Sequence, residues 1–352
     1  GDYTGAHALV LTDSTVANVE EFDFEPGHSY NITLGPHTVA SNETLKVDAS
    51  LLGAADALTF DGSKLQPVGL TNTNDLHFVG GAGNDTLVGC YGYNFYDLTH
   101  GGEDTASGTA FDSYNYFTMG AAFDAGDRLT GSSAVSSNYV DLNGDYTGAN
   151  AVTLNNGTLS GIGQMNFEPG HNYDITWADG DLAAHGTFNV NAQPLQASNQ
   201  ARFDGSAETN GHFVFLSGEG SDDFTGGSQS DTFRYDDGIA LSAATHDIIN
   251  AFDFANDIVE FAADVTGIAA ALDVGSVNKA TIDSDLTNIL TAARLPAHDA
   301  LLYTAKTGNL AGHVFLIVDG NGVAGYQTGS DLVIELSGAL HTGSISTANF
   351  SR

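Results

Sequence analysis

The sequence predicts an all-β fold: a parallel β-roll or β-solenoid built from two long repeats, with a small mixed cap at its C-terminal end. Three observations support this class. A long segment recurs at a fixed offset, short apolar runs alternate between Gly, Asn and Asp punctuation, and helical periodicity is absent from most of the first 240 residues. Hydrophobic residues make up 41% of the 352 residues, so the chain can bury a core.

The internal repeat sets the expected domain boundaries. Residues 2–33 align with residues 145–176 at an offset of 143, with 16 of 32 positions identical and no gap. The segment Phe-Asp-Gly-Ser at residues 60–63 recurs at 203–206 with the same offset. We therefore expect a first repeat over 1–143, a second over 144–240, and a C-terminal cap over 241–352.

Individual elements follow from local patterns. Apolar alternation predicts strands at 151–154, 173–177 and 187–190, and buried strands at 314–318 and 332–336. In the cap, the spacing of Leu286, Ile289, Leu290 and Ala293 predicts a helix over 282–295. Asp283 is the expected N-cap, and Pro296 follows the expected end.

The charge balance excludes several partners. There are 44 Asp and Glu against 9 Lys and Arg, a net charge of −35. Such a chain repels phosphate backbones and anionic lipid, so we expect no nucleic-acid partner. No run of 18 apolar residues occurs, so we expect no membrane insertion. The single cysteine, Cys90, cannot form an intrachain disulfide and is expected to be a buried small residue.

Glycine-aspartate segments carry the most specific pattern. Residues 80–88 fit G-G-x-G-x-D-x-U-x, where U is a large apolar residue, at every defined position. The next nine, 89–97, are a worn copy, and Asp104 follows Asp85 by nineteen residues. In the second repeat, 217–225 run directly into 226–234 with matching positions nine apart, and a degenerate turn follows at 235–240.

This spacing predicts calcium sites. Six residues make a turn and three make a strand, so glycine carbonyls and an Asp carboxylate face one point, which suits the oxygen preference of Ca²⁺. Two nonapeptides complete one turn of the roll, which stacks a loop on the loop about eighteen residues later. The alternative is a set of tight turns rich in Gly and Asp without an ion. The candidate ligands are Gly81, Gly83, Asp85, Asn94, Gly102 and Asp104, then Gly218, Gly220, Asp222, Gly227 and Asp231.

These nonapeptides resemble those of the repeats-in-toxin (RTX) family, calcium-binding surface proteins exported by Gram-negative type I secretion. The resemblance implies a parallel β-roll, calcium loading outside the cell, and a secretion region within 241–352. The C-terminal block resembles the family pattern D-x-I-x-x-F…D-x-[IV]-x-F, which adds Asp247 and Asp257 to the candidate ligands. Residues 318–334 resemble the family's terminal strand pair.

Two weaker candidates remain. Asp319, Asn321 and Asp331 lie in a loop loosely like an EF-hand, but Ser330 stands at the acidic twelfth position, so a plain hairpin is favoured. Glu-Pro-Gly-His recurs at 25–28 and 168–171, where a solvated turn is favoured over a metal site.

Catalytic layouts are missing, so we expect no enzyme. No two histidines lie three or four residues apart, and no G-x-S-x-G occurs. The prediction is a secreted, extracellular calcium-binding structural protein of the cell surface or matrix: a surface layer, fibre or adhesin. Expected partners are copies of itself in an oligomer or polymer, cell-surface polysaccharide, and the type I secretion machinery. The alternative is the calcium-binding export region of a polysaccharide-active secreted enzyme.

Overall fold

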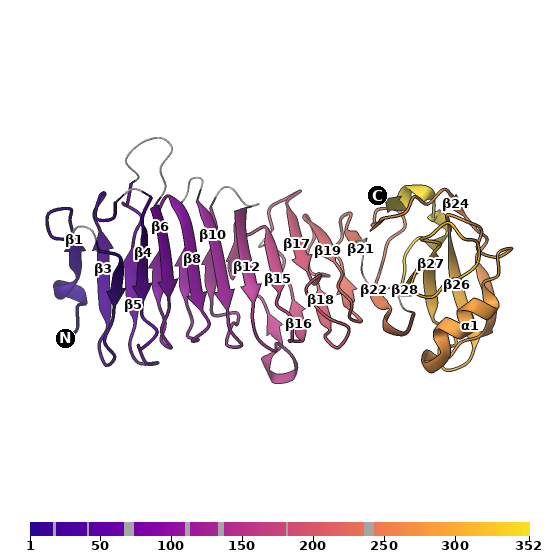
Figure 1. Ribbon diagram of the computed structural model, residues 1–352, viewed down its shortest axis with the longest axis horizontal. Coiled ribbons are helices and arrows are strands. Elements are labelled where there is room, and N and C mark those ends of the chain that lie inside the picture. The colour runs from indigo at the N-terminus through magenta and orange to yellow at the C-terminus, as the bar shows by residue number, and fades with distance from the viewer. Residues whose placement is uncertain are drawn as a thin grey trace. The chain divides into compact units, whose positions relative to one another are not determined.

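The fold class predicted from the sequence is confirmed. The computed structural model describes residues 1–16, 19–40, 42–66, 74–109, 113–132, 137–180, 182–235 and 243–352. Its regular structure is nearly all parallel β-strand, with one short α-helix, α1 (Ile282–Ile289), among the described residues (Figure 1). None of the helices in those ranges is long and apolar enough to cross a membrane.

Two compact units divide the chain: residues 1–168 with 178–182, and residues 169–177 with 183–352. The sequence repeat instead suggests boundaries at 143 and 240. In a solenoid each rung contacts only its neighbours, so the contact pattern need not break where the sequence repeats. Most of the degenerate turn expected at 235–240 lies outside the described residues.

In the first unit the chain alternates between two parallel sheets. One sheet has the order β1 (Leu9–Leu11), β3 (Tyr30–Leu34), β5 (Leu58–Asp61), β7 (Thr86–Val88), β9 (Thr105–Ser107), β11 (Arg128–Thr130) and β14 (Leu159–Ser160). The other has β2 (Glu21–Asp23), β4 (Thr44–Asp48), β6 (Asn74–Val79), β8 (Gly92–Leu98), β10 (Tyr114–Met119), β12 (Asn138–Leu142) and β15 (Gln164–Phe167). The unit also contains β13 (Val152–Thr153).

The turns of this unit are longer than two nonapeptides require. Thr86 pairs with Thr105, nineteen residues later, but Tyr30 pairs with Leu58, twenty-eight residues later. A period close to the expected eighteen residues therefore holds only near the nonapeptide segment. Elsewhere, longer turns, such as that between β4 and β5, increase the number of residues in each rung.

Inward-facing residues of both sheets form the core of the first unit. The burial patterns alternate strictly along β3, β4, β6 and β10, as period-2 side-chain placement requires. Phe78 stacks on Tyr96 at 5.0 Å and Tyr96 on Phe117 at 4.7 Å between ring centroids. Such cross-strand aromatic pairs add to the energy of area burial and fix the register.

The second unit is itself a roll of parallel strands and adds antiparallel strands. One sheet has the order β16 (Tyr173–Thr176), β18 (Ala201–Asp204), β20 (Asp223–Thr225), β22 (Asp247–Asn250), β28 (Leu332–Ser337), β27 (Val314–Val318), β26 (Asp299–Thr307) and β24 (Gly267–Ile268). The other has the order β17 (Thr187–Asn191), β19 (His212–Leu216), β21 (Thr232–Tyr235), β23 (Ile258–Phe261) and β29 (Phe350–Ser351). Strand β25 (Leu272–Ser276) pairs with β26. Strands β26, β27 and β28 pair antiparallel, and β28 joins the roll by pairing parallel with β22.

The predicted helix is shorter than expected. It ends at Ile289, because Leu290 leaves helical geometry and its carbonyl accepts from the backbone N–H of Tyr326. Leu286 and Leu290 are buried as predicted, but Ala293 lies beyond the helix and is exposed. Asp283 was wrongly expected to be the N-cap: that position is Thr281, and the Asp283 carboxylate accepts from the Tyr326 hydroxyl at 2.7 Å.

Candidate metal centre

The glycine-aspartate segments form the six-residue turns and short strands that their spacing predicts. Residues 80–85 form a turn before the three-residue strand β7. Residues 217–222 form a turn before β20, and residues 226–231 one before β21. Each turn therefore ends on an aspartate that immediately precedes a strand.

In the first unit these aspartates form one row across neighbouring rungs. The Asp85 carboxylate accepts from the backbone N–H of Leu58 at 2.7 Å and of Gly81 at 2.8 Å. Asp104 accepts in turn from the N–H of Asp85 at 2.9 Å, and Asp127 from the N–H of Asp104 at 2.8 Å. The structure thus brings Asp85 and Asp104 together, as the nineteen-residue spacing predicts.

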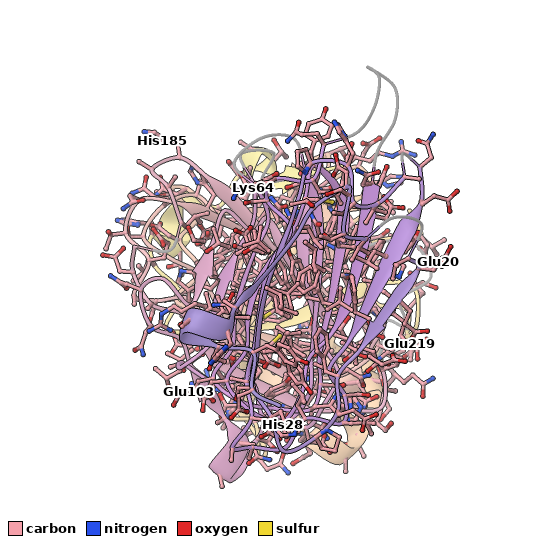
Figure 2. The ribbon with its side chains drawn as sticks, turned by 90° about the vertical axis from the view of Figure 1, so that its left-hand side faces the viewer. Glu20, His28, Lys64, Glu103, His185 and Glu219 are labelled. Carbon is pink, nitrogen blue, oxygen red and sulfur yellow. The ribbon has the colours of Figure 1, made fainter. Side chains whose placement is uncertain are left out.

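Asp104 has a buried oxygen with no hydrogen-bond donor. Its side chain is 1% exposed, and its Oδ2 has no partner among the described residues. Burial raises the pKa of Asp104 to about 7, and the charges of Asp85 and Asp127 contribute to the rise. The adjacent Glu103, by contrast, is exposed at the periphery (Figure 2). The burial of Asp104 is therefore specific to its place in the row.

Glycine is required where one turn stacks on the next. A Cβ on Gly83 would lie 1.9 Å from the carbonyl oxygen of Asp56, and a Cβ on Gly102 would lie 2.3 Å from that of Gly83. In the second unit, a Cβ on Gly220 would lie 2.1 Å from the carbonyl oxygen of Asn199. The glycines therefore let carbonyl oxygens of one rung approach the turn of the next, beside the aspartate row.

The second unit contains two more rows. In one, Asp222 accepts from the N–H of Ala201 at 2.9 Å, and Asp247 accepts from the N–H of Asp222 at 2.8 Å. The Ser217 hydroxyl donates to Asp247 at 2.6 Å. Burial raises the pKa of both carboxyls, and the charge of Asp222 raises that of Asp247 further.

The other row lies at the start of β21 and β23. Asp231 accepts from the N–H of Phe213 at 2.7 Å, and Asp257 accepts from the N–H of Asp231 at 3.0 Å. Asp231 is 0% exposed, and its Oδ2 makes no hydrogen bond among the described residues, but the backbone N–H of Gly227 is close enough to oppose the rise in its pKa. Burial raises its pKa to about 7, with a contribution from Asp257. Asp247 and Asp257, expected only from a resemblance, thus take the same place as the nonapeptide aspartates.

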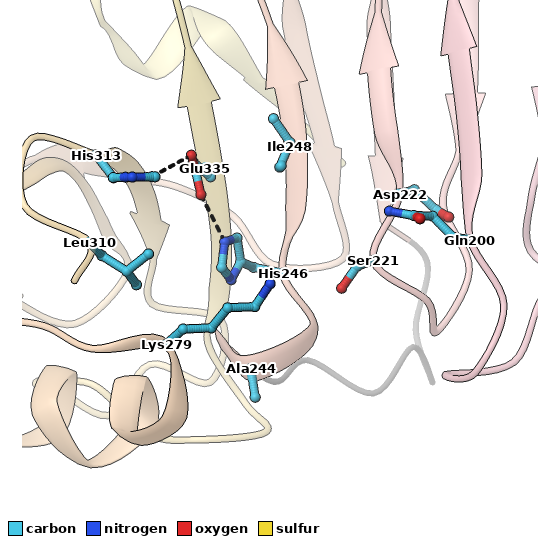
Figure 3. Close-up of a pocket in the computed structure, with 10 residues that line it drawn as sticks. All are labelled: Gln200, Ser221, Asp222, Ala244, His246, Ile248, Lys279, Leu310, His313 and Glu335. Atoms are coloured by element: carbon cyan, nitrogen blue, oxygen red, sulfur yellow. Dashed lines mark hydrogen bonds and ion pairs between the residues drawn. The ribbon is translucent and has the colours of Figure 1, made fainter. Parts of the chain in front are cut away.

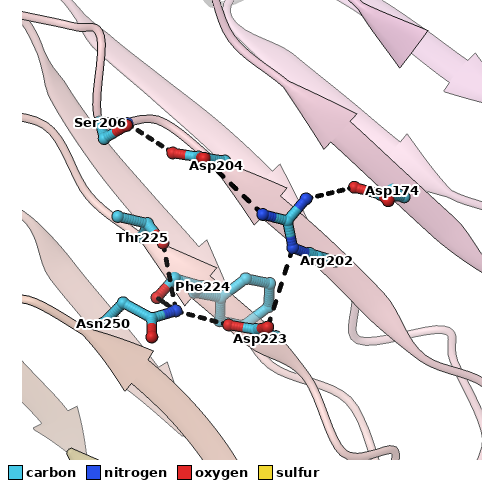
Figure 4. Close-up of polar contacts among 8 residues, drawn as sticks. All are labelled: Asp174, Arg202, Asp204, Ser206, Asp223, Phe224, Thr225 and Asn250. Carbon is cyan, nitrogen blue, oxygen red and sulfur yellow. Dashed lines mark hydrogen bonds and ion pairs between the residues drawn. The ribbon is translucent and has the colours of Figure 1, made fainter. Parts of the chain in front are cut away.

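Basic side chains neutralise acids on the outer face but not in the rows. On the outer face of β18, the Arg202 guanidinium lies 2.6 Å from Asp174, 3.7 Å from Asp204 and 3.8 Å from Asp223 (Figure 4). No Lys, Arg or His within the described ranges forms an ion pair with a row aspartate. The rows therefore hold negative charge that no protein cation balances there.

These residues fit a hard cation such as Ca²⁺. The possible metal ligands in the rows are oxygens, from aspartate carboxylates and main-chain carbonyls, which is the ligand chemistry of calcium. Both carboxylate oxygens of Asp85 and of Asp222 already accept from backbone N–H groups. The unpartnered Oδ2 atoms of Asp104 and Asp231 are acceptors that a cation would satisfy. The glycine positions Gly81, Gly218 and Gly227 lie in the same turns, each closely packed on the preceding rung.

Asn94 lies elsewhere. It is a buried residue of β8, and its amide donates to the carbonyl oxygen of Cys90 at 3.0 Å and to Asn115 at 3.0 Å. Asn115 donates likewise to Asn138 at 2.7 Å, which makes a buried amide ladder across β8, β10 and β12. The hydrogen bonds of Asn94 are thus made within this ladder and with Cys90, away from the aspartate row.

The sequence reasoning missed Asp127. Its turn lacks the doubled glycine of the nonapeptide, but Asp127-Arg128-Leu129 repeats the Asp-x-apolar order of Asp85-Thr86-Leu87. That three-residue order places an aspartate before an inward apolar side chain, and it could have predicted Asp127 as a member of the row.

Two further clusters lie outside the rows. On β2 and β4, the carboxylates of Glu21, Asp23 and Asp48 converge, the one such group of three found in the described ranges. The Lys46 ammonium lies 2.7 Å from Glu21 and 2.8 Å from Asp48, so a protein cation already occupies this cluster. The Glu-Pro-Gly-His segment at 25–28 forms an exposed turn, as favoured from the sequence.

A cavity of about 310 Å³ lies in the second unit, beside β22 and β28 (Figure 3). At its wall the Glu335 carboxylate bridges two histidines, 3.1 Å from His246 Nε2 and 2.7 Å from His313 Nδ1. Burial opposes ionisation of Glu335, but the hydrogen bonds from both histidines hold its pKa below the ordinary value. Lys279 also lines this cavity.

Comparison with known proteins identifies no relative. The chain matches no family model, no curated protein and no solved structure.

Proposed function

We propose that this chain is a calcium-binding structural protein of the cell surface or extracellular matrix, of the RTX type, exported by type I secretion. The carrying observation is the set of buried aspartate rows, in which two carboxylate oxygens form no hydrogen bond and no aspartate forms an ion pair, among the described residues. Calcium would bind at the turns of Asp85, Asp104, Asp222, Asp231 and their row neighbours, and it would supply the positive charge that the rows lack.

The proposed ion couples folding to location. Metal-binding energy becomes folding energy when the site exists only in the folded chain. Extracellular calcium modules typically bind at about 10⁻⁴–10⁻³ M, so the chain would be loose at low calcium inside a cell and ordered outside. This coupling suits a protein exported unfolded.

The experiment that tests calcium binding is a count of bound ions after equilibrium dialysis. Asp85→Ala and Asp222→Ala should each reduce the ions bound per chain and lower the thermal midpoint in calcium. Asp13→Ala, in an exposed turn outside the rows, is the control: it should keep every ion, and because it loses the hydrogen bond from the N–H of His37, any fall in its thermal midpoint should be equal in calcium and in chelator. Equal effects from all three substitutions would contradict the assignment.

Assembly and polysaccharide binding complete the proposed role. Calcium would screen or bridge the repulsion of a chain with net charge −35 and so permit self-association. Tyr93, Phe95 and Tyr114 are 36%, 37% and 40% exposed on neighbouring strands, an aromatic surface suited to a neutral polysaccharide. If the chain remains monomeric by sedimentation at millimolar calcium, the assembly proposal is wrong. If a neutral polysaccharide retains Tyr93→Ser as well as it retains the unaltered chain, the polysaccharide-binding proposal is wrong.

A further inference from the structure

The loop between β27 and β28 contains two buried carboxylates that face each other. In this antiparallel pair Val318 is opposite Leu332, so the next residues outward, Asp319 and Asp331, occupy opposed positions at the strand ends. They are 0% and 1% exposed. Like charges directly opposite each other destabilise a strand pair, and burial increases the cost.

The loop satisfies only part of this charge. Asp331 accepts from the N–H of Gly320 at 3.1 Å and of Gln327 at 2.7 Å. Asp319 Oδ1 accepts from the N–H of Gly322 at 2.6 Å, but its Oδ2 has no partner among the described residues. The buried Gln327 Oε1 likewise has no donor there. No ion pair to either aspartate occurs within the described ranges.

From this geometry we infer that the β27–β28 loop is a divalent-cation site, separate from the aspartate rows, in which Asp319, Asp331 and Gln327 bind Ca²⁺. The side-chain donors are all oxygens, the chemistry that calcium prefers. Asn321 is not a ligand: it is exposed and its Oδ1 accepts from the N–H of Val323. The acid missing at position 330 is supplied one residue later, by Asp331.

A bound cation would hold together the facing ends of β27 and β28, and β28 in turn pairs with β22.

The test is the calcium content of the full chain after equilibrium dialysis. Asp319→Asn, which keeps the shape and removes the charge, should bind one ion fewer per chain. Asp273→Asn, at an exposed position of β25, is the matched control and should keep every ion. An unchanged count for Asp319→Asn overturns the inference. A loss in Asp319→Asn together with no loss in Asp85→Ala and Asp222→Ala would instead refute the row sites and leave this one standing.

Gln327→Glu tests whether the Gln327 side chain is a calcium ligand, and it provides a second test if Asp319→Asn does not fold. As a ligand, a glutamate should tighten calcium binding and raise the thermal midpoint in calcium relative to chelator. If instead the Gln327 amide nitrogen donates to Asp319, the glutamate adds a third negative charge without an ion. The midpoint would then fall equally in calcium and in chelator, which overturns the site.

Discussion

Asp231→Asn should stabilise the chain strongly in chelator and much less in calcium. The substitution keeps the acceptor that bonds to the N–H of Phe213 and removes the charge of the buried side chain. In chelator, that charge is unbalanced, and it lies near Asp257 and Glu208, which also raise its pKa. In calcium, the same charge is a ligand, so its loss should cost binding energy.

The magnitude follows from the pKa. Burial raises the pKa of Asp231 from 3.8 to about 7. Ionising it in the fold therefore costs about 4 kcal/mol of unfolding free energy, because one pKa unit corresponds to about 1.4 kcal/mol. Because the folded pKa is raised, the stability is fully present below pH 3.8, falls as the pH rises, and is lost above about 7. In calcium at about one hundred times the dissociation constant, the bound ion returns about 3 kcal/mol to the unaltered chain, so the advantage of the variant at pH 8 should shrink from about 4 to about 1 kcal/mol.

The assay is urea unfolding followed by circular dichroism at pH 5 and pH 8, each in chelator and in calcium. In chelator the variant should exceed the unaltered chain by about 4 kcal/mol at pH 8 and by about 1–2 kcal/mol at pH 5, and calcium should reduce the difference at pH 8 to about 1 kcal/mol. Asp273→Asn, at an exposed position, is the control and should move neither curve. A variant less stable than the unaltered chain in chelator at pH 8 would refute the reasoning, since Asp231 would then be stabilising without an ion.

Three other substitutions test the packing around the site. Gly83→Ala places a methyl group 1.9 Å from a carbonyl oxygen and should cost about 1–3 kcal/mol by thermal unfolding, whereas Gly343→Ala, with no atom near its Cβ, should be neutral. Glu335→Gln removes the charge of the carboxylate that both histidines contact and should cost about 1.5–3 kcal/mol above pH 4.5. The loss should shrink as falling pH protonates Glu335 in the unaltered chain, and a constant loss across pH would contradict the pairing. Asn115→Ala interrupts the amide ladder and should cost about 1–3 kcal/mol equally in calcium and chelator, so a calcium-dependent loss would argue against a purely structural ladder.

The roll could be predicted because its information is local. A strand needs only alternate apolar residues, and the turn before β7 needs only the glycines and the aspartate of residues 80–85. The row contacts of Asp85 and Asp104 followed from their nineteen-residue separation. The same reasoning found the second-repeat turns, because each pattern fits within nine residues.

Other features depend on contacts that the local pattern does not contain. The helix ends at Ile289 because a loop residue far along the chain, Tyr326, bonds to the carbonyl of Leu290. The amide ladder through Asn94 depends on register between strands about twenty residues apart. For the loop of Asp319 the sequence favours a plain hairpin, because its acid is one residue late; the proposed cation site is argued from the opposed ends of β27 and β28, which only the fold brings together.

The most direct test of the account is far-ultraviolet circular dichroism of the chelated chain at pH 8 as calcium is added, with magnesium in a parallel titration. The account predicts a reduced β-signal in chelator, from a fold that is only marginally stable without ions, and a cooperative gain of β-signal with calcium at about 10⁻⁴–10⁻³ M, with a smaller response to magnesium. A full β-signal in chelator at pH 8, unchanged by calcium, would contradict it.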